Sequence, residues 1–344
     1  MHKLKVIYIL PEIAEHTATH FAHKRDLMQE FQNDIEFFVY APTLIGIAKI
    51  KIAYFFRSAR IFYVHYSFKG ALLALLLTKL FGGRVFYWNC GMPWVYRRGW
   101  LEERIFRFIL KRTVFVTGTN GLAELYAEQY SLDRAHIRVV SNYIRVSRMR
   151  EIRRDEGRKK LGITPEKKVV LFLHRLSRRK GAHLLPGIIK EFTDQDDVLF
   201  LVVGDGPERE KIESRIMNYE LWGNVRMEGS VSNSKTPVYF AVADVFLMPS
   251  EEEGMPNVLL EAMAVGIPFA VSDVGGVKEM TPPDLHEYVL PYGDVAMFVE
   301  KIKKLLESKE LRERISKEEQ EWVTQYDVAT VAPKFLELLE KEKK

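Results

Sequence analysis

A strand, a tight turn and a helix follow one another between Ala243 and Gly266, and this unit constrains the fold more than any other feature. The apolar run ADVFLMPS ends in proline and serine, and the helix formers VLLEAMAV follow the turn GMPN. Apolar runs that lead into basic or glycine-rich loops also occur within 169–185, 198–210 and 267–280. Such repeated units are typical of a parallel α/β sheet.

The loops that follow these runs carry complementary charges. In a parallel sheet they gather at the carboxyl edge, where ligands bind. One loop holds Arg175 and Lys180, while another holds Glu253, with seven residues between it and Glu261 in the helix. Carboxylates accept hydrogen bonds from sugar hydroxyls, and a helix start behind Gly254 favours a diphosphate. We therefore expect a nucleotide-sugar site. Two glutamates alone have another explanation, because acids at a helix start stabilise its dipole.

Several motifs in the second half of the chain occur in a recognisable order. They are HRLSRRKG, GDGP, EGSVS, ADVFLMPS, EEEGMPNVLLEAMAVGIP and VGG followed by Glu279. Together they resemble the motif series of the retaining GT-B glycosyltransferases of family 4. The resemblance implies an α/β fold of the GT-B class, with two Rossmann-like domains facing each other across a cleft. It also implies retaining, metal-independent transfer of a hexose from a UDP- or GDP-sugar to an acceptor hydroxyl, without a cofactor.

The same resemblance implies roles for individual residues. Arg175 and Lys180 would hold the donor diphosphate and Glu253 would contact the transferred sugar, so these three are the expected catalytic residues. Glu261 would contact the ribose. The other expected donor-binding residues lie in loops and are Gly204, Asp205, Val231, Gly254, Met255, Pro256, Asn257 and Val258. The chain departs from the family pattern at His174, which stands where the family usually has a glycine.

The N-terminal half resembles the family less closely, which leaves the acceptor side open. Its first strand–helix loop lacks the glycine pair of many relatives and holds His16 and Thr19 instead. After the strand RVFYW the family often has a histidine, whereas this chain has Asn89, followed by Gly91. These four residues are the candidates for the acceptor side. An asparagine can hydrogen-bond a sugar hydroxyl but cannot shuttle a proton.

The order of the apolar segments predicts two domains. Strands and helices alternate through residues 1–150, which we expect to form a Rossmann-like acceptor domain. Within it the strand DIEFFVY is expected to lead to the strand RIFYVHY without a helix between them. The charged segment 145–160 lacks a strand pattern and is the predicted linker, and 160–322 is the predicted donor domain. The resemblance further implies that a C-terminal helix, at about 325–344, packs back on the first domain.

The charge is divided unevenly between the two halves. Residues 1–150 hold 22 Lys and Arg against 11 Asp and Glu, a net of +11, whereas residues 151–344 hold 29 against 35, a net of −6. The segment from Tyr96 to Thr113 combines basic residues with Trp100, Phe106 and Phe108 at helical spacing. This composition is typical of helices that lie on anionic membranes. Packing of its aromatic face on the N-terminal sheet is the alternative.

Other features narrow the location and the partners. Cys90 is the only cysteine, which excludes an intrachain disulfide and fits a reducing compartment. The apolar run from Ala71 is shorter than the ~20 residues that span a bilayer. We therefore expect a cytoplasmic protein, peripheral on the inner face of the membrane, with a glycan or lipid-linked acceptor. No zinc-finger or RNA-binding aromatic motif accompanies the basic residues, so nucleic acid is not an expected partner. The acidic run 194–197 precedes its strand, so no metal is expected there.

Two further functions fit the same motifs. A sugar-nucleotide epimerase or a phosphorylase of the GT-B type would use the same nucleotide or phosphate site, and it would consume its substrate without a separate acceptor. A non-catalytic protein that binds a sugar nucleotide is the other alternative. The missing histidine in the N-terminal half keeps this last possibility open.

Overall fold

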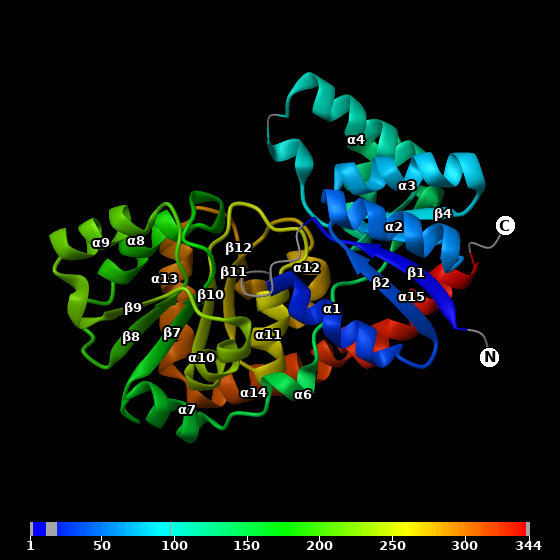
Figure 1. The fold of residues 1–344 in the computed structure, drawn as a ribbon. Coiled ribbons are helices and arrows are strands. Elements are labelled where there is room, and N and C mark those ends of the chain that lie inside the picture. The colour runs from blue at the N-terminus through cyan, green and yellow to red at the C-terminus, as the bar shows by residue number, and fades with distance from the viewer. Residues whose placement is uncertain (1–2, 12–18, 97, 342–344) are drawn as a thin grey trace. The chain divides into compact units, whose positions relative to one another are not determined.

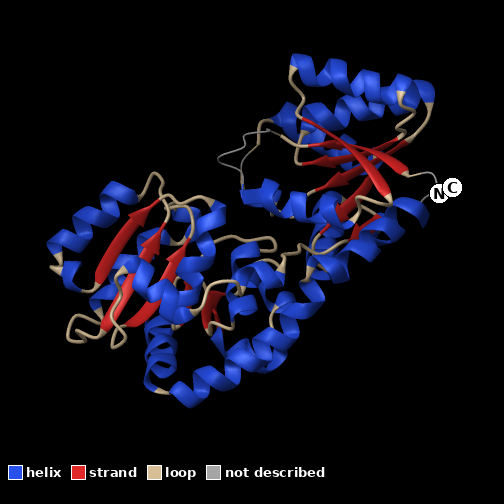
Figure 2. Cartoon of the chain, turned by 60° about the horizontal axis from the view of Figure 1, so that its bottom comes forward, coloured by secondary structure: helices blue, strands red, loops and turns tan. Residues whose placement is uncertain are grey.

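The computed structural model describes residues 3–11, 19–96 and 98–341, and the chain forms two compact units. The first unit consists of residues 1–142 and 328–344, and the second consists of residues 143–327. Each unit contains one six-stranded sheet in which every strand pair is parallel. Helices cover both faces of each sheet (Figure 2). The predicted α/β class is therefore confirmed.

The first sheet has the strand order β2-β1-β3-β4-β5-β6. Its strands are β1 (Leu4–Ile9), β2 (Ile35–Tyr40), β3 (Ile61–His65), β4 (Arg84–Trp88), β5 (Val114–Thr117) and β6 (Ile137–Val139). The helices of this unit are α1 (Thr19–Glu30), α2 (Leu44–Phe56), α3 (Phe68–Phe81), α4 (Trp100–Arg112), α5 (Asn120–Tyr130) and α15 (Val328–Lys341).

These helices form two layers. Side chains of α2, α3, α4 and α5 share one core with the strands. On the other face of the sheet, the ring of Phe335 in α15 lies 4.8 Å from that of Tyr63 in β3 and 5.8 Å from that of Phe31, just after α1. The C-terminal helix thus completes the first unit (Figure 1).

Helix α2 was not predicted from the sequence. The segment after β2 forms thirteen helical residues, because the Thr43 side chain accepts a hydrogen bond from Gly46 N at 3.1 Å and caps the helix start. The sequence LIGIAKIKIAYFF is apolar almost all round and rich in isoleucine, so its composition resembles that of a strand. The segment is nevertheless a helix, because Thr43 caps its start and because the parallel strands around it need a crossover connection.

The second sheet has the strand order β12-β11-β10-β7-β8-β9. Its strands are β7 (Lys168–Leu173), β8 (Val198–Val203), β9 (Val225–Gly229), β10 (Val245–Met248), β11 (Phe269–Ser272) and β12 (Val289–Leu290). The helices are α6 (Val146–Met149), α7 (Arg154–Leu161), α8 (Leu185–Lys190), α9 (Arg209–Asn218), α10 (Thr236–Val242), α11 (Asn257–Val265), α12 (Val277–Met280), α13 (Val295–Glu307) and α14 (Lys309–Trp322).

The segment 145–160 is part of the second unit instead of a linker. It forms α6 and most of α7, and two arginines of α7 bind the largely buried carboxylate of Asp244. Arg154 and Arg158 reach Asp244 at 2.7 Å and 3.1 Å, and Val169 N donates to the same side chain at 2.8 Å. These bonds fasten α7 to the start of β7. The charged composition without a strand pattern therefore belongs to a helix, α7, that is held to the second sheet by these bonds.

Candidate functional site

The predicted donor residues meet at the switch point of the second sheet, where the order of the strands reverses. Strands β7 and β10 pair in the middle of the sheet although about seventy residues separate them, and β8 and β11 flank them on either side. Ligands of open parallel sheets bind at the carboxyl ends of strands near such a switch point. The loops after β7 and β10 therefore start side by side, and they carry Lys180 and Glu253 respectively.

The carboxylate of Glu253 is buried and receives three hydrogen bonds. Lys180 Nζ donates to its Oε2 at 2.7 Å, while Ser250 Oγ and His174 Nε2 lie 2.9 Å and 3.2 Å from its Oε1. The side chain of Glu253 is 6% exposed, and that of Lys180 is 12% exposed. Loops from two strands thus build one charged cluster, which we call the Glu253 cluster: His174, Lys180, Ser250 and Glu253.

Electrostatics keep this carboxylate ionised. Burial by itself would raise the pKa of Glu253, but the charge of Lys180 and the hydrogen bonds from His174 and Lys180 outweigh it and lower the pKa to about 2. Glu253 is therefore a weak base at neutral pH. Its available role is to accept hydrogen bonds and to place a negative charge.

His174 is neutral and its tautomer follows from its contacts. Burial and the charge of Lys180 lower the pKa of His174, although Glu253 acts in the opposite direction. The Nδ1 atom accepts a hydrogen bond from Arg175 N at 3.0 Å, so Nε2 carries the proton and donates it to Glu253. Both ring nitrogens are engaged. The residue that departs from the family glycine thus links the β7 loop to the central carboxylate.

The glycine-rich loop after β11 supports the other side of Glu253. Gly275 has φ +56°, and a Cβ at this position would lie 1.8 Å from the backbone oxygen of Glu253. The next residue, Gly276, donates from its N–H to Gly254 O at 2.8 Å. Only a glycine allows such a close approach. Sequence analysis placed this loop at the carboxyl edge but did not identify its contact with Glu253.

The predicted loop residues fall into two groups. Gly204 packs against the backbone of His174, since a Cβ there would lie 1.9 Å from the His174 oxygen. It therefore positions the β7 loop. Arg175 and Asp205 expose their side chains, and Asp205 accepts a hydrogen bond from Gly206 N at 2.7 Å. Val231 is half-buried in the loop that follows the edge strand β9.

The loop that starts at Gly254 leads into α11, as predicted, but the helix begins at Asn257, so Asn257 and Val258 lie in its first turn instead of in the loop. Met255 and Pro256 are buried, and Glu261 is buried one turn inside the helix. No side chain caps the first turn of α11. Within the residues that the structure describes, Asn257 Oδ1 is buried and has no hydrogen-bond partner. An unsatisfied polar atom beside an uncapped helix start is the kind of position that a polar ligand can complete.

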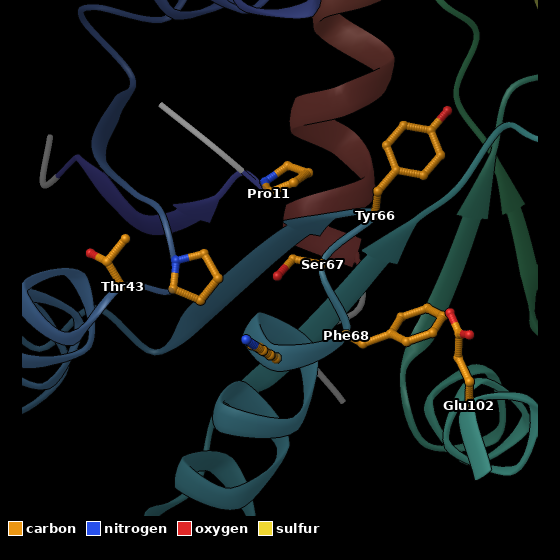
Figure 3. A pocket seen from close by; sticks show the side chains of 8 residues that line it. Pro11, Thr43, Tyr66, Ser67, Phe68 and Glu102 are labelled. Atoms are coloured by element: carbon orange, nitrogen blue, oxygen red, sulfur yellow. The ribbon is translucent and has the colours of Figure 1, made fainter. Parts of the chain in front are cut away.

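The first unit contains a cavity of about 400 Å³ at the carboxyl edge of its own sheet (Figure 3). It is lined by Pro11, Pro42, Thr43, Tyr66, Ser67, Phe68, Lys69 and Glu102. Most of these residues directly follow β1, β2 and β3, and Glu102 comes from the first turn of α4. None of these lining residues is predicted from the sequence, because three of the segments carry no recognisable motif.

Of the residues predicted for the acceptor side, Asn89 and Gly91 are not among the described residues that line this cavity. His16 lies outside the described residues, as does the side chain of Thr19, the first residue of α1. Asn89 is buried, and its Oδ1 accepts hydrogen bonds from Gly91 N at 2.9 Å and from Tyr126 Oη at 3.0 Å. These bonds shape the loop after β4. A role of Asn89 and Gly91 toward an acceptor stays a prediction.

Two other predictions concern charged segments. The basic segment Tyr96–Thr113 contains α4, which buries Phe106 and Leu110 in the core and exposes Trp100 and Phe108. Packing on the sheet and an exposed aromatic side therefore coexist in one helix. The acidic run 194–197 precedes β8, as predicted. Among the described residues, no group of three His, Cys, Asp or Glu side chains is arranged to hold a metal ion.

Comparisons with known proteins agree with this architecture. Residues 153–322 match the family described as glycosyl transferases group 1. The 2-deoxystreptamine N-acetyl-D-glucosaminyltransferase of Niallia circulans is 30% identical over 174 residues, which are 50% of this chain and 45% of that protein. The lipopolysaccharide core biosynthesis glycosyltransferase LpsE of Rhizobium meliloti is 27% identical over 225 residues, 65% of this chain and 63% of LpsE. The chain spans about a third to a half of the length of the first curated relatives that it matches.

The fold as a whole also has a solved counterpart. The crystal structure of the Anabaena HepE protein in complex with UDP superimposes with a TM-score of 0.81 at 16% sequence identity, over 98% of this chain and 99% of HepE. At such low identity the likeness concerns the fold. Two Rossmann-like units of the GT-B type, as predicted, are therefore confirmed.

Proposed function

From the match of residues 153–322 to the glycosyl transferases group 1, we propose a retaining, metal-independent transfer of a hexose from a UDP- or GDP-sugar to an acceptor hydroxyl. The observation that carries the proposal is the Glu253 cluster at the switch point of the second sheet. A buried cation and a buried carboxylate there can serve a diphosphate and a sugar at once. The UDP bound to HepE supports a uridine donor.

Lys180 and Glu253 of the cluster, together with residues around it, have distinct parts in this reaction. The departing diphosphate gains negative charge, which Lys180, Arg175 and the start of α11 would stabilise. Lys180 has three N–H donors and uses one for Glu253, so it can bind phosphate oxygens without releasing the carboxylate. Glu253 would orient the sugar by accepting hydrogen bonds from its hydroxyls. Glu261 would bind the ribose, and Asn257 Oδ1 would gain a partner on the ligand.

The absence of an available base in the cluster favours a reaction driven by electrostatics. Glu253, with a pKa of about 2, is a poor proton acceptor, and both nitrogens of His174 are engaged in hydrogen bonds. The acceptor proton therefore needs another destination. In a retaining transfer the acceptor attacks on the face from which the diphosphate departs, and a diphosphate oxygen can accept that proton.

The cavity of the first unit is the proposed acceptor site. It combines the rings of Tyr66 and Phe68 with the polar groups of Ser67, Lys69 and Glu102 (Figure 3). Apolar walls with a few polar groups are typical of small-ligand sites, and this set suits the hydroxyls and the ring faces of a glycan. We propose a glycan or lipid-linked acceptor. Trp100 of α4 is exposed and lies beside basic residues. We therefore propose that the reaction takes place at the cytoplasmic surface of an anionic membrane.

A donor screen with defined variants tests the proposal. UDP- and GDP-hexoses are incubated with glycoside and lipid-linked acceptors, and we expect nucleotide release to require an acceptor and to persist in EDTA. Removing Lys180 or Glu253 (Lys180→Met, Glu253→Gln) should lower turnover by about 10²–10³-fold. The neighbouring exposed Glu251→Gln is the matched control. Wild-type turnover in either cluster variant, or loss of activity in EDTA, contradicts the proposal, and product NMR decides whether the anomeric configuration is retained.

The same screen separates the alternatives. An epimerase or phosphorylase would convert the sugar nucleotide without any acceptor. A non-catalytic binding protein would show a donor-dependent rise in melting temperature without nucleotide release, because a ligand that binds only the folded state stabilises it.

A further inference from the structure

Helices α2 and α3 expose many large apolar side chains, although each helix already buries one side in the core of the first unit. In α3 the buried positions include Gly70, Ala71 and Ala74, whereas Leu76 and Leu80 are exposed. The exposed large apolar side chains of both helices are Leu44, Ile45, Ile52, Phe55, Phe56, Leu72, Leu76, Leu80 and Phe81. We call this set the α2–α3 face. Core packing does not account for these exposed side chains, because the buried side of the two helices is formed by other residues: Ile50, Ala53, Tyr54, Ala71, Ala74 and Leu77.

The α2–α3 face is one continuous surface. The ring of Phe55 in α2 lies 5.0 Å from that of Phe81 in α3, in an edge-to-face arrangement. Tyr54 also donates from its hydroxyl to Leu77 O at 3.3 Å, which fixes the two helices side by side. Helix α4 adjoins α3 on the other side (Figure 1). Scattered exposed apolar residues are ordinary, but a contiguous apolar patch over neighbouring helices marks an interaction site.

The chain segment that forms this face carries only positive charges, while Glu36 pairs with its Arg57 and Glu102 of α4 lines the same cavity as Lys69. Residues 37–101 contain no Asp or Glu and nine Lys or Arg, a span of 65 residues that includes all of α2 and α3. Lys49, Lys51, Lys69 and Lys79 are exposed within these two helices. Among the described residues none of these four lysines forms an ion pair. The apolar face is therefore bordered by cations whose charge is not neutralised inside the fold.

This pattern selects one kind of occupant. A second copy of the chain would place the same cationic face against itself, and the like charges would repel. A protein partner without a matching acidic rim is a poorer fit, because it would leave the bordering lysines without opposite charges. An anionic bilayer takes apolar side chains into its surface layer and attracts the lysine heads that extend from it. None of the described helices is long and apolar enough to cross a bilayer.

We propose that the α2–α3 face docks the first unit on an anionic lipid bilayer. The helices lie parallel to the surface, their large apolar side chains enter the headgroup layer, and the bordering lysines contact lipid phosphates. The exposed Trp100 and Leu101 at the start of α4 extend the contact. The proposal deepens the membrane location suggested for α4 alone, because it assigns the principal contact to two helices that nothing in the sequence motifs singled out.

Vesicle flotation of the full chain tests the proposal. The probes are vesicles of phosphatidylcholine alone and vesicles with 30% phosphatidylglycerol as a chosen anionic content, without donor or acceptor. We expect the anionic vesicles to be bound at least tenfold more tightly. The triple variant Lys49→Gln/Lys51→Gln/Lys79→Gln should lose about 100-fold, since each lysine near an anionic surface contributes about fivefold. The variant Phe56→Ser/Leu76→Ser/Leu80→Ser should lose vesicle binding in high salt.

Matched controls distinguish this face from other exposed groups. The second unit exposes Met217, Tyr219 and Trp222, so their replacement by serine removes a comparable apolar area elsewhere. These control variants should bind like wild type, and circular dichroism confirms that every variant folds. Equal binding to neutral and anionic vesicles, unchanged binding of both face variants, or a stable dimer that the face variants dissociate would overturn the proposal. Because no sugar nucleotide is present, failure here leaves the transferase proposal untouched, and the reverse also holds.

Discussion

Replacing Lys180 by methionine should destabilise the second unit through the carboxylate that it leaves behind. The pKa of Glu253 falls from 4.5 to about 2 in the folded chain. Each pKa unit corresponds to about 1.4 kcal/mol, so the environment of ionised Glu253 contributes about 3 kcal/mol to folding at neutral pH. Because the folded-state pKa is the lower one, this stabilisation is present above pH 4.5 and is lost as the pH falls toward 2.

Lys180→Met inverts this dependence. Burial then dominates and raises the pKa of Glu253 above its usual value, because the largest opposing charge is gone. We expect a loss of about 3–5 kcal/mol at pH 7.5, the range for breaking a buried ion pair. As the pH falls toward 5.5 the carboxylate takes up a proton, and the variant should regain up to about 1.4 kcal/mol per pH unit. The Glu253 site of the wild type contributes no such slope in this window.

Urea unfolding at several pH values, followed by circular dichroism, measures these differences. The double variant Lys180→Met/Glu253→Gln should recover most of the lost stability, because a neutral amide can still accept the bonds from Ser250 and His174. Its transfer activity should stay as low as that of Lys180→Met. A single variant as stable as wild type, or a double variant less stable than the single one, would refute the reasoning.

Three further substitutions probe the cluster and the core. His174→Gly removes a donor to Glu253, so the acid limb of the pH–rate profile should move to higher pH while KM changes little. Gly275→Ala should cost several kcal/mol and most of the activity, because its Cβ would meet Glu253 O at 1.8 Å, whereas Gly293→Ala, also at positive φ but in open space, should cost about 1 kcal/mol. Burial raises the pKa of Glu319 well above its usual value, so wild-type stability should fall with rising pH by up to about 1.4 kcal/mol per unit; Glu319→Gln should abolish that slope in urea titrations.

Much of the fold could be predicted because hydrophobic runs mark buried parallel strands. Strands β2, β3 and β4 of the first unit correspond to the predicted runs DIEFFVY, RIFYVHY and RVFYW. Helix α2 could not be recognised in the same way, because its outward residues are as apolar as its inward ones and no period appears. The helix in segment 145–160 could not be recognised either, because its position depends on contacts with Asp244, a residue more than eighty positions away.

The candidate site divides along the same line. Lys180 and Glu253 could be named from motifs, and the switch point between β7 and β10 brings them to 2.7 Å. The parts played by Ser250, His174 and Gly275 could not, since each is defined by a contact across two loops. The cavity of the first unit could not be predicted from the sequence either. Its lining comes from four segments that meet only through the sheet order.

Because the two halves of the chain carry opposite net charges, the two proposed interactions should differ in how strongly they respond to salt. The membrane contact depends on exposed lysines of a half with net charge +11, so screening should weaken it steeply. The donor site is built into a half with net charge −6, where the long-range field repels a diphosphate and the attraction comes from the largely buried Lys180. Salt screens that repulsion, and it also screens the attraction between the diphosphate and the exposed Arg175. The two effects on donor affinity therefore oppose each other.

We therefore expect vesicle binding to fall at least about tenfold between 50 and 500 mM NaCl, while the donor Kd changes less than about threefold. Calorimetric titration of the donor and vesicle flotation, performed in the same buffers, provide both values. A donor affinity that falls as steeply as vesicle binding would mean that exposed cations hold the diphosphate. The buried ion pair of Lys180 and Glu253 would then not be the centre of the site.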